Sequence, residues 1–141
     1  MGAWGSGVFD NDEALDWASD LLHFNDLKAL SKAIDTVIKS EDYVEAPDAE
    51  NLLCACEILA VLNGKSPTTL PDDVCNWVKT HETLNTLALI PDALLALEKV
   101  TGENSELFQL LQENEQHFSV WYETVRSIKE YLEKRAAAEN H

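Results

Sequence analysis

The sequence has little of what membrane spans, secretory signals and disulfide frameworks require. Its longest apolar run, around residues 58–62, is far short of the ~20 residues that cross a bilayer. No basic residue precedes Lys28, and the N-terminus has no apolar signal stretch. The three cysteines, Cys54, Cys56 and Cys75, are an odd number, which argues against a disulfide framework. We therefore expect a cytoplasmic protein whose thiols stay reduced.

Basic residues are scarce. Ten Lys and Arg stand against 26 Asp and Glu, which gives a formal net charge of −16. Such a charge repels nucleic acid and anionic membranes and favours cationic partners. We expect no nucleic-acid and no membrane partner. The charge either attracts a basic partner protein or only keeps the protein soluble.

The sequence also lacks the motifs of catalytic and metal sites. No serine or cysteine has the flanking pattern of a known nucleophile. Cys54 and Cys56 lie two residues apart in a helical stretch, so their side chains point about 200° apart and cannot chelate one ion. The histidines stand far apart: His23, His81, His117 and His141. We therefore predict no catalytic residue, no metal and no cofactor.

Apolar residues make up 45% of the 141 residues and recur with helical spacing. No segment alternates every two residues, as a strand would. The sequence thus predicts an all-α, compact single-domain bundle of about six to seven helices over residues 1–141. The expected helices cover about 12–22, 25–39, 47–63, a short segment from 72 or 73, 91–101, 105–111 and 118–138. The tail at 136–141 is expected to fray.

The first nine residues are too glycine-rich for a helix and contain two large aromatic side chains. We predict an ordered arm over residues 1–9, fixed by burial of Trp4 and Phe9. Asp10, Asn11 and Asp12 then supply side chains that can cap the first helix.

The third predicted helix is apolar all round, which places it in the middle of the bundle. Glu57 lies within it, between Cys56 and Ile58. A buried carboxylate must be paired, hydrogen-bonded or protonated. We favour a structural bond to a capping amide, a tryptophan indole or a cation such as Arg126. The alternative is a general base with a raised pKa, which would need a second group that the sequence does not reveal.

Carboxylates gather around the start of the first helix. They are Asp10, Asp12, Glu13, Asp16 and Asp20. The cluster lacks the ligand spacing and turn glycine of a calcium loop. Acids in a first turn complement the helix dipole, so these residues are either a solvated helix face or a face that binds a cationic partner.

The opening M-G-A-W-G-S-G-V-F-D-N-D-E-A-L-D-W resembles that of a mostly bacterial family, the domain of unknown function 4259. The central helix around Glu57, the Asn63–Gly64 stop and the tryptophans downstream are similar to that family too. The resemblance implies a compact helical protein and supplies no reaction. We predict structural roles for Trp4, Gly5, Gly7, Phe9, Asn11, Trp17, Glu57, Gly64, Trp77 and Trp121.

These observations favour a small, acidic, cytoplasmic binding protein of the kind that bacterial immunity proteins represent. Such a protein would neutralise a cationic partner protein or toxin, because acidic surfaces accelerate association with basic sites. One alternative is an uncharacterised enzyme or small-ligand-binding domain that uses Glu57 and the N-terminal acids. A second alternative is a housekeeping interaction module.

Overall fold

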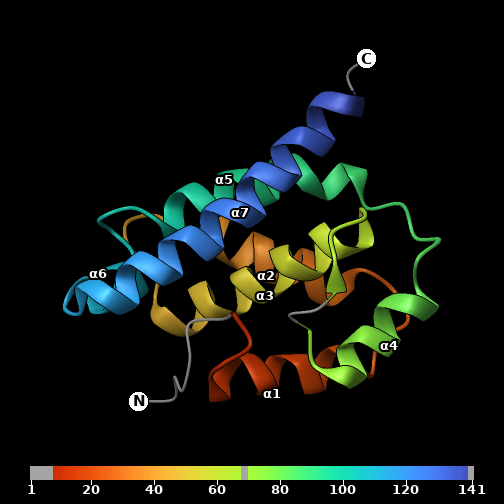
Figure 1. Ribbon diagram of the computed structural model, residues 1–141, viewed down its shortest axis with the longest axis horizontal. Helices are drawn as coiled ribbons and strands as arrows, with labels where there is room; N and C mark the ends of the chain where they lie inside the picture. The colour runs from red at the N-terminus through yellow and green to blue at the C-terminus, as the bar shows by residue number, and fades with distance from the viewer. Residues whose placement is uncertain (1–7, 68–69, 140–141) are drawn as a thin grey trace.

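The computed structural model describes residues 8–67 and 70–139 and confirms the predicted all-α class (Figure 1). Within these ranges the chain forms seven α-helices, one 3-10 helix and no β-strand. The elements are α1 (Asp12–Leu21), α2 (Lys28–Ile38), α3 (Ala46–Leu62), α4 (Asp72–Thr80), η2 (Leu87–Leu89), α5 (Ile90–Val100), α6 (Glu106–Gln112) and α7 (Glu115–Glu139). Trp4, Gly5 and Gly7 lie outside the described residues.

Helix α3 occupies the centre of the bundle, as predicted. It contacts each of the other six α-helices, and every residue from Leu52 to Ala60 is buried. Figure 1 shows α2 and α3 between α5 and α7 on one side and α1 and α4 on the other. A helix can be apolar all round only where neighbours cover all its faces. None of the described helices is both long and apolar enough to span a membrane.

Two predicted helix starts are wrong by about three residues. Helix α2 begins at Lys28 rather than Asn25, because the Asp26 carboxylate accepts a hydrogen bond from the Lys28 amide at 3.0 Å and holds the chain in a turn. Helix α7 begins at Glu115 rather than Phe118, since Asn114 accepts from the His117 amide at 3.2 Å. Its last described residue is Glu139, so residues 136–139 are helical.

Side-chain caps fix the starts of α1 and α6. Asn11 Oδ1 accepts from the Ala14 amide at 2.8 Å, and Ser105 Oγ accepts from the Phe108 amide at 3.3 Å. Phe9 is only 5% exposed, which confirms the predicted burial of that part of the arm. The cap and the buried ring together set where α1 begins.

Two leucines on the predicted helices are exposed. Leu95 is 55% and Leu110 is 49% exposed. Helix α5 packs through a narrow stripe in which Ala93 and Ala96 alternate with larger residues, and Leu95 lies outside that stripe. Short α6 buries only Leu107. The expected burial holds for Trp77 and Trp121, which are 5% and 6% exposed.

Lys99 on α5 closes the C-terminal end of α2. Its ammonium donates to the carbonyl oxygens of Val37 at 3.4 Å, Ile38 at 3.0 Å and Ser40. The Val37 carbonyl also accepts from the Ser40 amide at 3.1 Å, and Val37 and Ile38 lie at the negative end of the α2 dipole. Lys99→Met should therefore lower the free energy of unfolding by about 1 to 2 kcal/mol. Urea denaturation would measure the loss. Lys39→Met, on the same end of α2 but exposed, should change the free energy little, and equal losses for both variants would contradict this role for Lys99.

Candidate functional site

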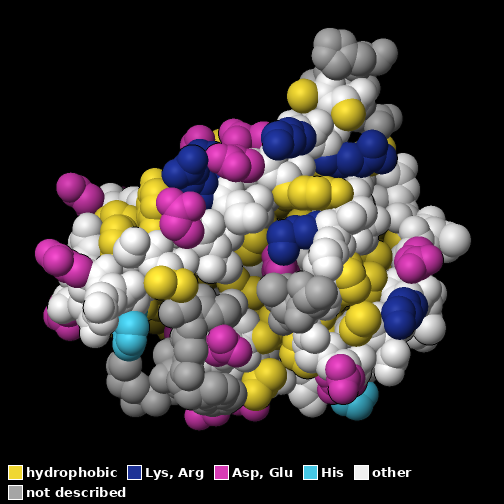
Figure 2. Space-filling view, viewed as in Figure 1, with side chains coloured by type: hydrophobic (Ala, Val, Ile, Leu, Met, Phe, Trp, Pro, Cys, Tyr) yellow, Lys and Arg dark blue, Asp and Glu magenta, His cyan; other side chains and the backbone are white. Residues whose placement is uncertain are grey.

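Three of the five predicted acids form one exposed row on α1. Asp12, Asp16 and Asp20 are spaced four residues apart and lie on one helix face. No Lys, Arg or His of the described chain forms an ion pair with them. Figure 2 shows acidic side chains along the lower edge of the molecule, where α1 runs in Figure 1. We call these three residues the α1 acidic row.

The other two predicted acids do not join this row. Asp10 and Glu13 are half-buried, and Glu13 Oε2 accepts a hydrogen bond from Asn51 of α3 at 3.2 Å. Glu50 lies close to Glu13. Burial, and secondly repulsion by Glu13, raises the pKa of Glu50. Glu13 therefore belongs to the packing of α1 against α3, while the acidic row faces solvent.

Beside the acidic row, a groove of about 570 Å³ opens between α1, α2 and α3. Aromatic side chains of Trp17 and Phe24 and the small side chains of Ala29 and Ala33 line it. Its charged lining consists of Asp20, His23, Lys28, Lys32 and Asp48, and Thr36 and Asn51 complete the lining. Trp17, for which the sequence predicts a structural role, is half-buried and borders the groove.

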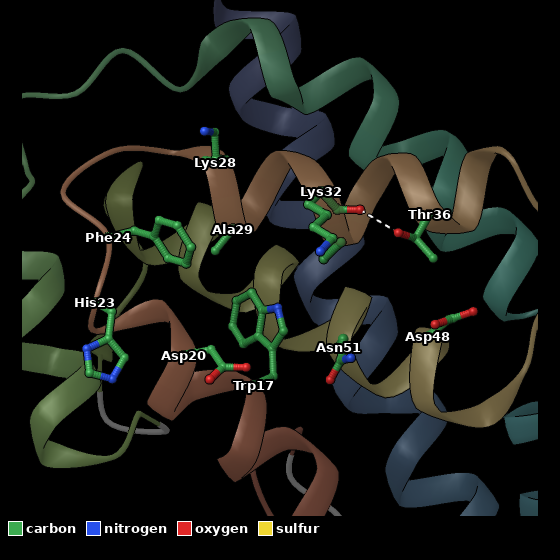
Figure 3. Close-up of a pocket in the computed structure, with 11 residues that line it drawn as sticks. Trp17, Asp20, His23, Phe24, Lys28, Ala29, Lys32, Thr36, Asp48 and Asn51 are labelled. Carbon is green, nitrogen blue, oxygen red and sulfur yellow. Dashed lines mark hydrogen bonds between the residues drawn. The ribbon is translucent and has the colours of Figure 1, made fainter.

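The side chains in the groove differ in direction (Figure 3). The Lys32 side chain points toward the space between Trp17 and Asn51, and the nitrogen-bearing edge of the Trp17 indole faces the same side. Lys28 points away from Trp17, and Asp48 lies at the far end of the groove. The groove thus presents the Lys32 ammonium, the Trp17 indole N–H and the Asn51 Oδ1, an acceptor without a hydrogen-bond partner among the described residues, beside apolar surface.

Glu57 is buried and paired, as predicted, but its partner is not Arg126. Glu57 Oε1 lies 2.9 Å from the Lys65 ammonium, and the side chains of the pair are 3% and 19% exposed, respectively. Arg126 instead pairs with Glu123 and Glu130 on the surface of α7. The pair lines a shallow groove whose other wall is α7. Pairing with Lys65 supports the structural role of Glu57.

The turn after α3 brings Lys65 back over Glu57. The Lys65 amide donates to Ala60 at 3.0 Å and the Gly64 amide donates to Val61 at 3.0 Å, which is the Schellman pattern of a helix end. Gly64 has φ +111°, which favours glycine. The predicted stop at Asn63–Gly64 is therefore confirmed. Sequence reasoning missed Lys65, the lysine that directly follows this stop.

The thiols of α3 are not reactive groups. Cys54 and Cys56 are buried, and Cys54 Sγ donates to the Val8 carbonyl at 3.3 Å. Burial raises the pKa of both thiols, so little thiolate forms near neutral pH. The third cysteine, Cys75, is half-buried, and all three are free.

The fold and these surfaces define a compact, all-helical protein with an acidic helix face beside an aromatic groove. Across the described residues, no three His, Cys, Asp or Glu side chains gather as a metal site would need. The chain belongs to the family described as domain of unknown function DUF4259, whose model matches residues 2–124. No curated protein matches the chain. No solved structure matches it either.

Proposed function

We propose that this protein binds a basic partner protein through the α1 acidic row. The observation that carries the proposal is the row itself: Asp12, Asp16 and Asp20 are exposed on one helix face and have no ion-pair partner among the described residues. Three aligned carboxylates produce a local negative field that attracts a cationic surface. A partner that contacts them loses little, because no internal ion pair has to break first.

The rest of the surface supports this choice of helix. Over α5 and α7, Figure 2 shows acidic side chains beside Lys and Arg side chains. Arg126, for example, lies 3.3 Å from Glu123 and 3.1 Å from Glu130. Interspersed charges of both signs cancel at a distance, whereas the charges of the α1 acidic row add. The row therefore produces a stronger negative field than the mixed charges over α5 and α7.

More specifically, we propose that the protein is an immunity-type inhibitor that acts in the cytoplasm and neutralises a basic toxin. Three free cysteines support a reducing compartment. A strongly acidic inhibitor gains association rate when it meets a basic active site. A housekeeping interaction module would use the same helix face, so the identity of the partner distinguishes the two roles. The partner can be identified by placing a photo-crosslinking amino acid at Ser19, next to the row, and analysing the crosslinked product by mass spectrometry.

Reversing the charge of the row should slow association with the identified partner. Asp16→Lys should reduce the association rate constant by about two- to tenfold at low salt, and the difference should shrink near 0.1 M salt, where the Debye length is about 10 Å. Stopped-flow mixing at two salt concentrations would measure both effects.

Glu133→Lys on α7 is the matched control, because Glu133 is also exposed and its substitution changes the net charge by the same amount. If the acids serve only solubility, both reversals should change the rate equally. Equal association rates for the two variants would therefore refute a specific role of the α1 acidic row. Circular dichroism of each variant would verify that the fold is unchanged.

A further inference from the structure

We propose that the groove between α1, α2 and α3 binds a small organic monoanion, a carboxylate attached to a flat apolar group. The groove shares Asp20 with the α1 acidic row, but the Lys32 ammonium and the Trp17 indole N–H, which face its interior, are hydrogen-bond donors. A lysine in the groove would repel a basic side chain, so the ligand proposed here differs in charge from the basic partner protein.

The groove has the size and lining of a small-molecule site. Its volume of about 570 Å³ falls within the range of ligand pockets. Ala29 and Ala33 form its floor one helical turn apart, and larger side chains there would fill the space. The rings of Trp17 and Phe24 provide apolar surface against which a flat group can stack.

Part of this surface is held in place before any ligand arrives. The Phe24 carbonyl oxygen accepts a hydrogen bond from Trp77 Nε1 at 2.9 Å, and Trp77 is buried. This bond fixes the backbone that carries Phe24, although the Phe24 ring is 38% exposed. A preorganised apolar wall loses little conformational entropy when it binds a ligand.

The donors inside the groove select an anion. Lys32 Nζ makes no ion pair, and Trp17 Nε1 has no hydrogen-bond acceptor, among the residues the structure describes. Both face the same space (Figure 3). A carboxylate placed there would accept a charge-assisted hydrogen bond from Lys32 and a second bond from the indole.

The remaining charged lining limits the anion to one negative charge. Lys28 points away from Trp17, while Asp20 and Asp48 stand at opposite sides of the groove and His23 lies near Asp20. The two carboxylates balance the two lysines. A ligand with two or more negative charges would place its additional charge close to Asp20 or Asp48, so a monoanion fits best.

A charge series of one molecular shape tests the proposal. The probes are 3-phenylpropionate, its neutral amide 3-phenylpropanamide, and the cationic 3-phenylpropylamine, each titrated into the ¹⁵N-labelled full chain. We expect 3-phenylpropionate to shift the Trp17 indole N–H signal with a dissociation constant on the order of 1 mM, as its size allows. The amide and the amine should bind about tenfold more weakly or not at all. The spectrum of Trp17→Phe identifies the Trp17 signal.

Substitutions of lysines on α2 identify the positive charge that binds the carboxylate. Lys32→Met should weaken 3-phenylpropionate binding about tenfold. Lys39→Met, on the same helix but outside this groove, should leave it unchanged. Both positions are exposed, and the dispersion of the amide spectrum verifies that each variant is folded.

Three results would overturn the proposal. They are no shift of the Trp17 signal with 3-phenylpropionate, equal or tighter binding of the amine, and equal binding by the wild type and Lys32→Met. Under the proposed function, Asp16→Lys slows association with the partner protein. The same variant should leave binding of the anion unchanged, because Asp16 does not line the groove. Failure of the anion site and failure of the acidic row are therefore distinguishable.

Discussion

Replacing Lys65 with methionine is expected to lower the free energy of unfolding by about 3 to 5 kcal/mol. The substitution removes the cation that lies 2.9 Å from a carboxylate that is almost fully buried. A buried charge that loses its counter-ion keeps its desolvation cost without the attraction that offset it. Chemical denaturation followed by circular dichroism would measure the loss.

Glu57→Leu is the informative comparison, because it removes the other half of the same pair. The Lys65 side chain is 19% exposed, so its ammonium can move toward water when the carboxylate is gone. We therefore expect a loss of about 1 kcal/mol for Glu57→Leu, and a smaller loss for the double variant than for Lys65→Met alone. The buried carboxylate is costly only when it stays in place without its cation.

A Lys65→Met variant as stable as the wild type would show that Glu57 does not depend on this cation. Additive losses in the double variant would show that the two side chains are not energetically coupled. Either result would return Glu57 to the alternative in which its carboxyl group serves a ligand or a reaction. Lys79→Met, an exposed lysine at the end of α4, controls for removal of a positive charge from an acidic protein.

The burial of Glu57 could be predicted from sequence, whereas its partner could not. The burial follows from local pattern, since its neighbours on α3 are apolar on all sides. The partner depends on the direction of the chain after Gly64, which turns Lys65 back toward the helix. Sequence reasoning left the partner open among a capping amide, a tryptophan indole and a cation such as Arg126. A helix pattern predicts which residues face inward. It does not predict which side chain, from another helix or from the following turn, contacts them.

The groove was missed for a related reason. Ala29 and Ala33 fall on the inward face of α2 and fit the same periodic pattern as Leu30 and Ile34. Periodicity identifies a face but not whether the volumes on facing helices fill the space between them. For the same reason, the position of Trp17 on the inward face of the first helix did not reveal that its indole borders the groove. A spacing of four residues places Asp12, Asp16 and Asp20 on one face, whereas sequence reasoning grouped these three with Asp10 and Glu13, which are half-buried.

The second large loss of stability is expected at Gly64, in the turn that positions Lys65. Gly64→Ala should lower the free energy of unfolding by about 2 to 4 kcal/mol. Gly64 has φ +111°, a backbone conformation that side-chain-bearing residues rarely adopt. A Cβ atom at this position would also lie 2.8 Å from the Tyr131 hydroxyl oxygen. That hydroxyl donates to the Asn63 carbonyl at 3.2 Å, so moving it away breaks a contact between α7 and the turn.

Thermal unfolding of matched variants can separate the strain from the clash. Gly102→Ala is the control, because a Cβ atom there would meet its nearest neighbours at 3.6 and 3.7 Å and Gly102 has no positive φ; we expect a change within about 1 kcal/mol. Tyr131→Phe removes the oxygen that the new Cβ would meet. If both causes act, Gly64→Ala should cost less in the Tyr131→Phe background than in the wild type, while a residual loss remains from the strained backbone. Equal effects of Gly64→Ala and Gly102→Ala would mean that the turn relaxes without cost. Lys65 would then not need glycine before it to reach Glu57.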